Sequence, residues 1–183
     1  MNPVALSLVM LNFAVFGLLA LFFFRRRGGL NARWWVTAAP FFVAPALALA
    51  AAAGVLPPVT DRLQLAAIPL ALASIGLMLA ALHAHRVRVA LWHQPHDAPE
   101  ELVTRGPYRW VRHPFYVAYA LALAAVVVLY PHPGTGAVLG WGLAALSLTA
   151  AREERRLRAS RFGAAYAVYQ RATGRFWPRL RRP

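Results

Sequence analysis

The chain has 183 residues, 60% of them hydrophobic, and a formal net charge of +14. This length fits one membrane domain, 1–183, and leaves no room for a separate soluble domain. All twenty basic residues are arginines and no cysteine is present, which excludes lysine Schiff bases, disulfides, thiolate metal sites and cysteine nucleophiles.

Five apolar runs are long enough, or nearly long enough, to cross a bilayer. Hydrocarbon cannot satisfy backbone N–H and C=O groups, so each run must be helical. A span needs about 20 residues; the first three runs reach that length, and the last two gain it from flanking aromatic and snorkelling residues. The runs are 3–24, 36–56, 63–82, 115–130 and 137–151.

The arginines predict the orientation of these runs. Nineteen of the twenty follow the first, third and fifth runs, and only Arg62 lies in the two opposite loops. Because basic loops stay in the cytoplasm, we expect an all-α polytopic membrane protein with five transmembrane helices, an N-terminus outside and a cytoplasmic C-terminal helical cap. The positive charge of the chain then indicates contact with anionic lipid headgroups rather than binding of nucleic acid. Heavy use of Ala and Arg suggests a bacterial source, and hence the bacterial inner membrane.

The first three runs, within 1–82, are typical of a helical scaffold. Their prolines bend helices, and their small residues favour close packing. Asn12, polar within the first run, either forms a hydrogen bond between helices, which is the commoner role, or contacts a substrate.

Four histidines follow the third run or end it: His83, His85, His93 and His96. They either bind a metal together with nearby carboxylates or lie solvated at the membrane interface. Because His83 and His85 face different sides of a helix, the sequence favours the interfacial alternative, and no metal is expected.

Polar residues concentrate in 100–178, in two clusters that flank the last two runs. The first cluster, 104–116, includes Arg112 and His113, and the second begins at Glu153 and Glu154. Only two runs and the short loop 131–136 separate the clusters. The two runs must therefore form an antiparallel hairpin, which places the clusters side by side.

The two clusters have complementary chemistry. Pro114 fits the first turn of a helix, and the free N–H groups of that turn attract an anion. Arg112 and His113 add donors there, whereas Glu153 and Glu154 suit a cation, so the pair indicates a ligand with a free amino-acid group. Alternatively, the basic cluster only sets topology, and the glutamates only pair with arginines three or four residues away.

The tail after the last run combines aromatic residues with arginines. Phe162, Tyr166 and Tyr169 are spaced i, i+4, i+7 and share one helical face, at the membrane interface or on the bundle. Trp177 is expected at the membrane surface. Arg175, close by, either contacts a lipid headgroup or serves the site by steering the acceptor or supporting Glu154.

Several short motifs stand in order across 100–178. They are Gly106-Pro107-Tyr108, Arg112-His113-Pro114-Phe115-Tyr116, Glu153-Glu154, Phe162-Gly163 with Tyr166 and Tyr169, and Arg175 with Pro178. In this order the chain resembles the isoprenylcysteine carboxyl methyltransferase and phospholipid methyltransferase superfamily. Ala118 stands where that family usually has glycine, and its methyl group narrows the groove beside the fourth helix.

The resemblance implies S-adenosylmethionine bound at the cytoplasmic end of the last two helices. It also implies a lipophilic acceptor that enters from the bilayer: a small lipid or isoprenoid-type carboxylate, amine or hydroxyl. The implied catalytic residues are Arg112, Glu154 and Arg175. The implied cofactor-binding residues are Leu102, Val103, Gly106, Tyr108, His113, Pro114, Tyr116 and Glu153.

Two other functions stay open. Membrane reductases of the sterol-reductase type share this C-terminal architecture by resemblance, but 183 residues leave little room for a dinucleotide cradle and no Gly-rich phosphate motif is present. A non-enzymatic membrane scaffold would explain the apolar runs, but it would give no function to the two adjacent polar clusters.

Overall fold

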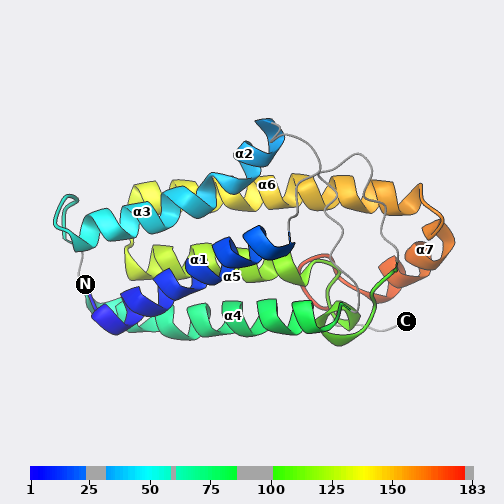
Figure 1. The fold of residues 1–183 in the computed structure, drawn as a ribbon, viewed down its shortest axis with the longest axis horizontal. Helices are drawn as coiled ribbons and strands as arrows, with labels where there is room; N and C mark the ends of the chain where they lie inside the picture. The colour runs from blue at the N-terminus through cyan, green and yellow to red at the C-terminus, as the bar shows by residue number, and fades with distance from the viewer. Residues whose placement is uncertain (24–31, 59–60, 86–100, 180–183) are drawn as a thin grey trace.

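A computed structural model describes residues 1–23, 32–58, 61–85 and 101–179. Within these residues the regular structure is helical, apart from an isolated bridge between Val111 and Gly174. The expected all-α class is therefore confirmed. The long helices lie side by side along one axis, with the N-terminus at one end and α7 at the other (Figure 1). The helices are α1 Pro3–Phe23, α2 Ala32–Ala38, α3 Pro40–Ala52, α4 Ala67–His83, α5 Pro114–Leu129, α6 Pro133–Arg158 and α7 Gly163–Ala172, with 3-10 turns η1 Asp61–Ala66 and η2 Gly106–Arg109.

Three stretches of the described residues are long and apolar enough to cross a membrane: Trp35–Ala52, Leu63–His83 and Pro133–Arg158. Pro3–Leu18 and Pro114–Leu129 are shorter apolar helices. The 16 residues of α5 extend over about 24 Å, somewhat less than the hydrocarbon core of about 30 Å. An integral membrane protein is thus supported, and five spans with a cytoplasmic cap remain a prediction.

Prolines and one glycine set the helix boundaries. Proline opens α3, α5 and α6, where its missing N–H has no intrahelical partner to lose. The second apolar run is divided at Ala39 and ends at Ala52, short of the expected residue 56. Gly54 has a φ of 75°, and the bonds from Gly54 N to Ala51 O and from Val55 N to Ala50 O form a Schellman cap.

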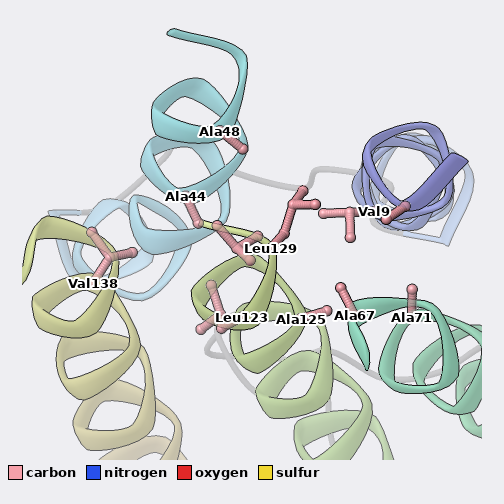
Figure 2. Packing of buried hydrophobic residues seen from close by; sticks show 11 residues of the cluster. Val9, Ala44, Ala48, Ala67, Ala71, Leu123, Ala125, Leu129 and Val138 are labelled. Atoms are coloured by element: carbon pink, nitrogen blue, oxygen red, sulfur yellow. The ribbon is translucent and has the colours of Figure 1, made fainter. Parts of the chain in front are cut away.

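The core at the N-terminal end of the bundle is built mostly of alanine. These residues come from α1, α3, α4, α5 and α6, and Figure 2 shows their side chains facing one another across the helices. Small side chains let the helix backbones approach closely, which is how membrane helices gain packing energy. The cluster, here called the alanine core, consists of Ala5, Val9, Ala44, Ala48, Ala67, Ala71, Leu123, Ala125, Val126, Leu129 and Val138.

A buried polar contact joins three helices further along the bundle. Asn12 Nδ2 donates to the carbonyl of Ala71 at 3.3 Å. The Ser74 hydroxyl donates to the carbonyl of Ala118 at 2.7 Å and lies 3.3 Å from Asn12 Oδ1. Asn12 therefore forms the hydrogen bond between helices that its place in an apolar run predicts.

Candidate functional site

The hairpin of α5 and α6 positions the site. Its turn is tight because His132 caps α6: Gly134 N donates to His132 Nδ1 at 3.0 Å, and His132 N donates to Thr135 Oγ1 at 3.2 Å. The two helices run antiparallel, so the start of α5 meets the end of α6 near α7 (Figure 1). The expected adjacency of the arginine–histidine cluster and the paired glutamates is confirmed by direct contacts between them.

Glu154 is the buried charge at this junction, with a side chain only 1% exposed. Arg112 Nε donates to Glu154 Oε1 at 2.9 Å. Arg175 reaches both oxygens, through Nε at 3.1 Å and Nη2 at 2.7 Å, and Gln170 Nε2 donates to Oε2 at 3.3 Å. A carboxylate is stable in such a place only when it is paired and hydrogen-bonded. These four residues are called the Glu154 cluster below.

Backbone contacts hold the tail against the start of α5. Arg112 N donates to Gly174 O at 2.8 Å, and His113 N donates to Arg175 O at 3.2 Å. The side chain of Arg112 also donates to Thr173 O. A Cβ at Gly174 would lie 1.6 Å from the carbonyl oxygen of Trp177, so the chain can fold back here only with glycine. This fold-back delivers Arg175 to Glu154.

Glu153 has different surroundings from its neighbour. Its side chain is 14% exposed, and His113 Nδ1 lies 3.5 Å from its Oε2. The Tyr116 hydroxyl donates to its Oε1. No arginine among the described residues pairs with it. Glu153 is therefore a carboxylate in reach of solvent, with a neutral hydroxyl and one imidazole beside it.

His113 bridges the two glutamates. Its Nε2 lies 3.3 Å from Glu154 Oε1, and its ring stacks on Tyr116 with centroids 5.2 Å apart. Burial lowers the pKa of His113, but hydrogen bonds to Glu153 and Glu154 outweigh burial and raise that pKa above its ordinary value. The site thus keeps a positive charge between the two carboxylates to higher pH than a free histidine would.

The segment before α5 packs on the end of α4. Val103 and Tyr108 are buried against Ala81 and Ala84, and Leu102 is half-buried. Gly106 has a φ of 59°, and a Cβ there would come within 3.1 Å of the Ala84 Cβ. This segment adjoins the site through Tyr169, whose hydroxyl donates to the carbonyl of Tyr108 at 2.6 Å.

The predicted site residues therefore fall into two groups. Arg112, His113, Tyr116, Glu153, Glu154 and Arg175 contact one another, with Pro114 opening α5 beneath them. The second group lies in the segment before α5 and consists of Leu102, Val103, Gly106 and Tyr108. Tyr166 and Tyr169 are both buried, so the shared aromatic face of α7 turns onto the bundle rather than toward the membrane surface.

Sequence reasoning missed two partners of this site. His85 Nε2 lies 2.8 Å from the Tyr108 hydroxyl, and its ring stacks on Phe115 at 5.8 Å. Burial and the nearby Arg105 lower the pKa of His85. Gln170 donates a hydrogen bond to Glu154. Its place directly after Tyr169 of the tyrosine motif is the one sequence feature that could have indicated this contact. His93 and His96 lie outside the described residues, within which no group of three metal-ligating side chains occurs.

The fold is that of an all-helical integral membrane protein, with a polar cluster where the start of α5 contacts the end of α6. The model of the isoprenylcysteine carboxyl methyltransferase family matches residues 63–159, more than half of the chain. The chain therefore belongs to that family, as its motifs predict. The match includes Arg112, His113, Glu153 and Glu154, whereas Arg175 lies beyond it.

One curated relative matches part of the chain. The chain is 38% identical over 79 residues to the cobalt-zinc-cadmium resistance protein CzcN of Cupriavidus metallidurans. The shared stretch is 43% of this chain and 36% of that relative, so the chain spans only about a third of the relative's length. No solved structure matches the chain.

Proposed function

We propose that this protein transfers a methyl group from S-adenosylmethionine to a lipophilic acceptor at the cytoplasmic face of the membrane. Family membership supports methyl transfer. The observation that supports this cofactor is the contrast between the two glutamates. Glu154 is paired with Arg112 and Arg175, whereas the adjacent Glu153 is partly exposed and has no arginine partner within the described residues.

The chemistry of these side chains fits the methionine part of the cofactor, which is a zwitterion. The Glu153 carboxylate suits its ammonium group. The protonated His113 and the N–H of Phe115, in the first turn of α5, suit its carboxylate. Leu102, Val103, Gly106 and Tyr108 are proposed to complete the cofactor site from the neighbouring segment, with Pro114 and Tyr116 fixing the start of α5.

Methyl transfer needs alignment more than covalent help from the protein. When bound, the cofactor supplies a methyl group on a sulfonium, and the acceptor's lone pair takes that carbon as the carbon–sulfur bond breaks toward sulfur. The protein's task is then to hold the acceptor in line and to exclude water. A site at the cytoplasmic end of the α5–α6 hairpin would both align the acceptor and exclude water.

The three residues expected to be catalytic are hydrogen-bonded together, because Arg112 and Arg175 both donate to Glu154. Glu154 has both oxygens occupied and is almost fully enclosed, so we assign it, together with Arg112, the positioning of α5 against the tail. Arg175 has a side chain that is 38% exposed. It supports Glu154 with two donors and keeps Nη1 without a hydrogen bond to the described residues, which suits a contact with the acceptor's polar end.

The proposal extends to topology. Five helices cross the bacterial inner membrane, with the N-terminus outside, so that the cofactor arrives from the cytosol and the acceptor from the bilayer. The partition of the arginines supports this orientation. Membrane lipids are then the other partners of the chain.

Binding of methyl-labelled S-adenosylmethionine to the purified protein tests the function. We expect saturable binding and, after incubation with bacterial membranes, transfer of the label to the lipid extract. Saturable binding of a nicotinamide dinucleotide in its place would favour the reductase. A folded protein that binds neither compound would favour the scaffold.

A further inference from the structure

One hydroxyl in the charged part of the site has no hydrogen-bond partner. Tyr166, on α7, is only 1% exposed, and its hydroxyl is the one enclosed side-chain N or O atom without a partner in the part of the chain that the structure describes. A buried hydroxyl without a hydrogen bond is unfavourable, because it has given up the bonds that it forms in water. Phenylalanine would fill the same space without this penalty, so packing alone does not explain the hydroxyl.

The Tyr166 hydroxyl lies among the charged groups of the site. Burial raises the pKa of Tyr166 most, the charges of Glu154 and Glu153 raise that pKa further, and the charges of Arg112 and Arg158 lower it. The hydroxyl therefore keeps its proton at neutral pH. It is a hydrogen-bond donor within electrostatic range of two carboxylates.

Glu154 has no position left for this donor. An ionised carboxylate accepts about four hydrogen bonds. Glu154 Oε1 accepts from Arg112 at 2.9 Å and from Arg175 at 3.1 Å, and it lies 3.3 Å from His113 Nε2. Oε2 accepts from Arg175 at 2.7 Å and from Gln170 at 3.3 Å. Another donor must therefore leave before a further hydroxyl can bond to this carboxylate.

Arg175 is the charged donor that can leave. Its side chain is 38% exposed, whereas the side chains of Arg112 and His113 are 9% and 8% exposed. Because Arg175 donates to both oxygens of Glu154, its departure frees a position on each of them. The Tyr166 hydroxyl then has a charged acceptor, and Glu154 recovers one of the hydrogen bonds that it gave up.

The charges around the two glutamates indicate what attracts Arg175. The ion pairs of Glu153 and Glu154 involve three arginines and the protonated His113, so four positive charges stand against two negative ones. This excess of positive charge favours an anion at the exposed side of the site. The planar guanidinium of Arg175 matches the oxygens of a carboxylate or a phosphate.

We propose that Glu154 exchanges donors when an anionic ligand binds. Arg175 turns from Glu154 to an oxyanion, a carboxylate or phosphate in the polar head of the methyl acceptor, and the Tyr166 hydroxyl donates to the Glu154 oxygen that becomes free. Tyr166 is thus a positioning residue, because it acts on the ligand through Arg175. The ligand's identity as the methyl acceptor rests on the proposed function, whereas the exchange of donors does not.

A double-variant cycle tests the exchange without any ligand. In the wild-type background, Tyr166→Phe removes an unpaired hydroxyl, so the unfolding equilibrium constant in detergent micelles should fall or stay the same. In the Arg175→Met background the hydroxyl already donates to Glu154, so Tyr166→Phe should raise that constant by about tenfold or more. An equal effect of Tyr166→Phe in the two backgrounds would overturn the proposal.

Tyr130→Phe is the matched control for this cycle. It removes a hydroxyl that donates to the carbonyl of Pro57, at the opposite end of α5 from Arg175. Its effect on the unfolding constant should be the same with and without Arg175→Met, since distant sites act independently.

A second measurement tests whether an anion draws Arg175 away, and it needs only wild type and Tyr166→Phe. The probes are laurate, dodecyl phosphate and dodecanol, which share an alkyl chain and differ in the head. Wild type should bind an anion more tightly than dodecanol, and Tyr166→Phe should weaken that binding by about tenfold, with dodecanol binding unchanged. Preference for laurate would indicate a carboxylate head, and preference for dodecyl phosphate would indicate a phosphate such as that of a lipid headgroup.

Two results of the probe experiment would overturn the proposal: no preference of the wild type for either anion, or equal affinities of wild type and Tyr166→Phe for the anions. Binding of S-adenosylmethionine is measured on the same samples. A wild-type protein that shows the exchange but binds no S-adenosylmethionine would remove the proposed function and keep the exchange.

Discussion

The two ends of the bundle are held together by different forces. At the N-terminal end, the alanine core relies on close contact between small apolar side chains from five helices (Figure 2). At the α7 end, the Glu154 cluster relies on charge and hydrogen bonds around one enclosed carboxylate. Both regions have an enclosed centre, but only the second contains groups whose burial becomes costly when a partner is removed.

This difference predicts how each end responds to substitution. Lipid is as apolar as the side chains of the alanine core, so a truncation there loses packing and little else. Removal of one partner from a buried ion pair leaves an uncompensated charge, which is among the largest single-residue effects known. The α7 end should therefore be the more sensitive of the two, in stability and in ligand binding.

The largest effect is expected for Arg112→Met. The change leaves Glu154 without one of its donors in a nearly closed site, and loss of a buried charge partner typically costs about 3–5 kcal/mol. Unfolding in detergent micelles measures this loss. Val126→Ala, in the alanine core, should cost a fraction of that amount.

A second variant tests the cause of the Arg112→Met effect. Adding Glu154→Gln to Arg112→Met removes the carboxylate that Arg112 pairs with, so the costs of the two changes should overlap and the double variant should lose less stability than the two single variants together. A double variant as unstable as the sum of the single variants would show that Arg112 acts by packing rather than by pairing.

The next largest effect is expected for Glu153→Gln. If Glu153 holds the cofactor's ammonium group, its neutralisation removes a charge-assisted hydrogen bond and weakens S-adenosylmethionine binding by roughly 10- to 150-fold. Calorimetry on the purified protein measures the affinity. Unfolding free energy should fall less than in Arg112→Met, since glutamine keeps an oxygen that accepts from the Tyr116 hydroxyl.

Glu101→Gln is the matched control for Glu153→Gln. It removes the same charge from a surface pair with Arg105, whose side chains are 35% and 37% exposed, and such pairs contribute little. Affinity for the cofactor should stay at the wild-type value. Unchanged affinity in a folded Glu153→Gln protein would place the ammonium group elsewhere.

A smaller effect is expected for Arg175→Lys. Arg175 donates one hydrogen bond to each oxygen of Glu154, and lysine cannot reproduce this two-donor geometry. Turnover should fall roughly tenfold, in line with one lost charge-assisted hydrogen bond, while membrane insertion and cofactor binding persist. Arg171→Lys, on the exposed side of α7, should keep wild-type turnover. Near wild-type turnover of Arg175→Lys would favour the lipid-headgroup contact.

The parts of the site that sequence could predict are those that chain connectivity enforces. A six-residue loop between two apolar runs makes a hairpin compulsory, so Arg112 and His113 had to meet Glu153 and Glu154. The start of α5 at Pro114 followed from the missing N–H of proline.

The parts that sequence could not predict depend on the path of the tail. Nothing in the spacing of residues 159–175 shows that Gly174 folds back on Trp110 and Arg112, which decides that Arg175 closes over Glu154. The bond between His85 and Tyr108 likewise needs the packing of η2 on α4. The shortness of α3 depends on the cap at Gly54, which apolar periodicity does not register.

The smallest effect is a pH dependence centred on His113. Burial lowers the pKa of His113, but the two glutamates raise the folded-state pKa above its usual 6.5. A raised folded-state pKa means that the folded protein binds the proton more tightly than the unfolded chain does. The resulting stabilisation is fully present below pH 6.5 and is lost as the pH rises through the folded-state value.

The difference in unfolding free energy between wild type and His113→Gln should therefore be largest at acidic pH and shrink toward alkaline pH. Glutamine keeps a hydrogen-bonding side chain but does not titrate, so effects of other groups cancel in the difference. A chemical-shift titration of the His113 ring gives the folded-state pKa independently. A difference that grows as the pH rises would mean that burial, rather than Glu153 and Glu154, dominates the charge state of His113. In that case His113 would be a neutral donor at the start of α5, and the carboxylate of an amino-acid ligand would have only that neutral ring and the N–H of Phe115 to bind it.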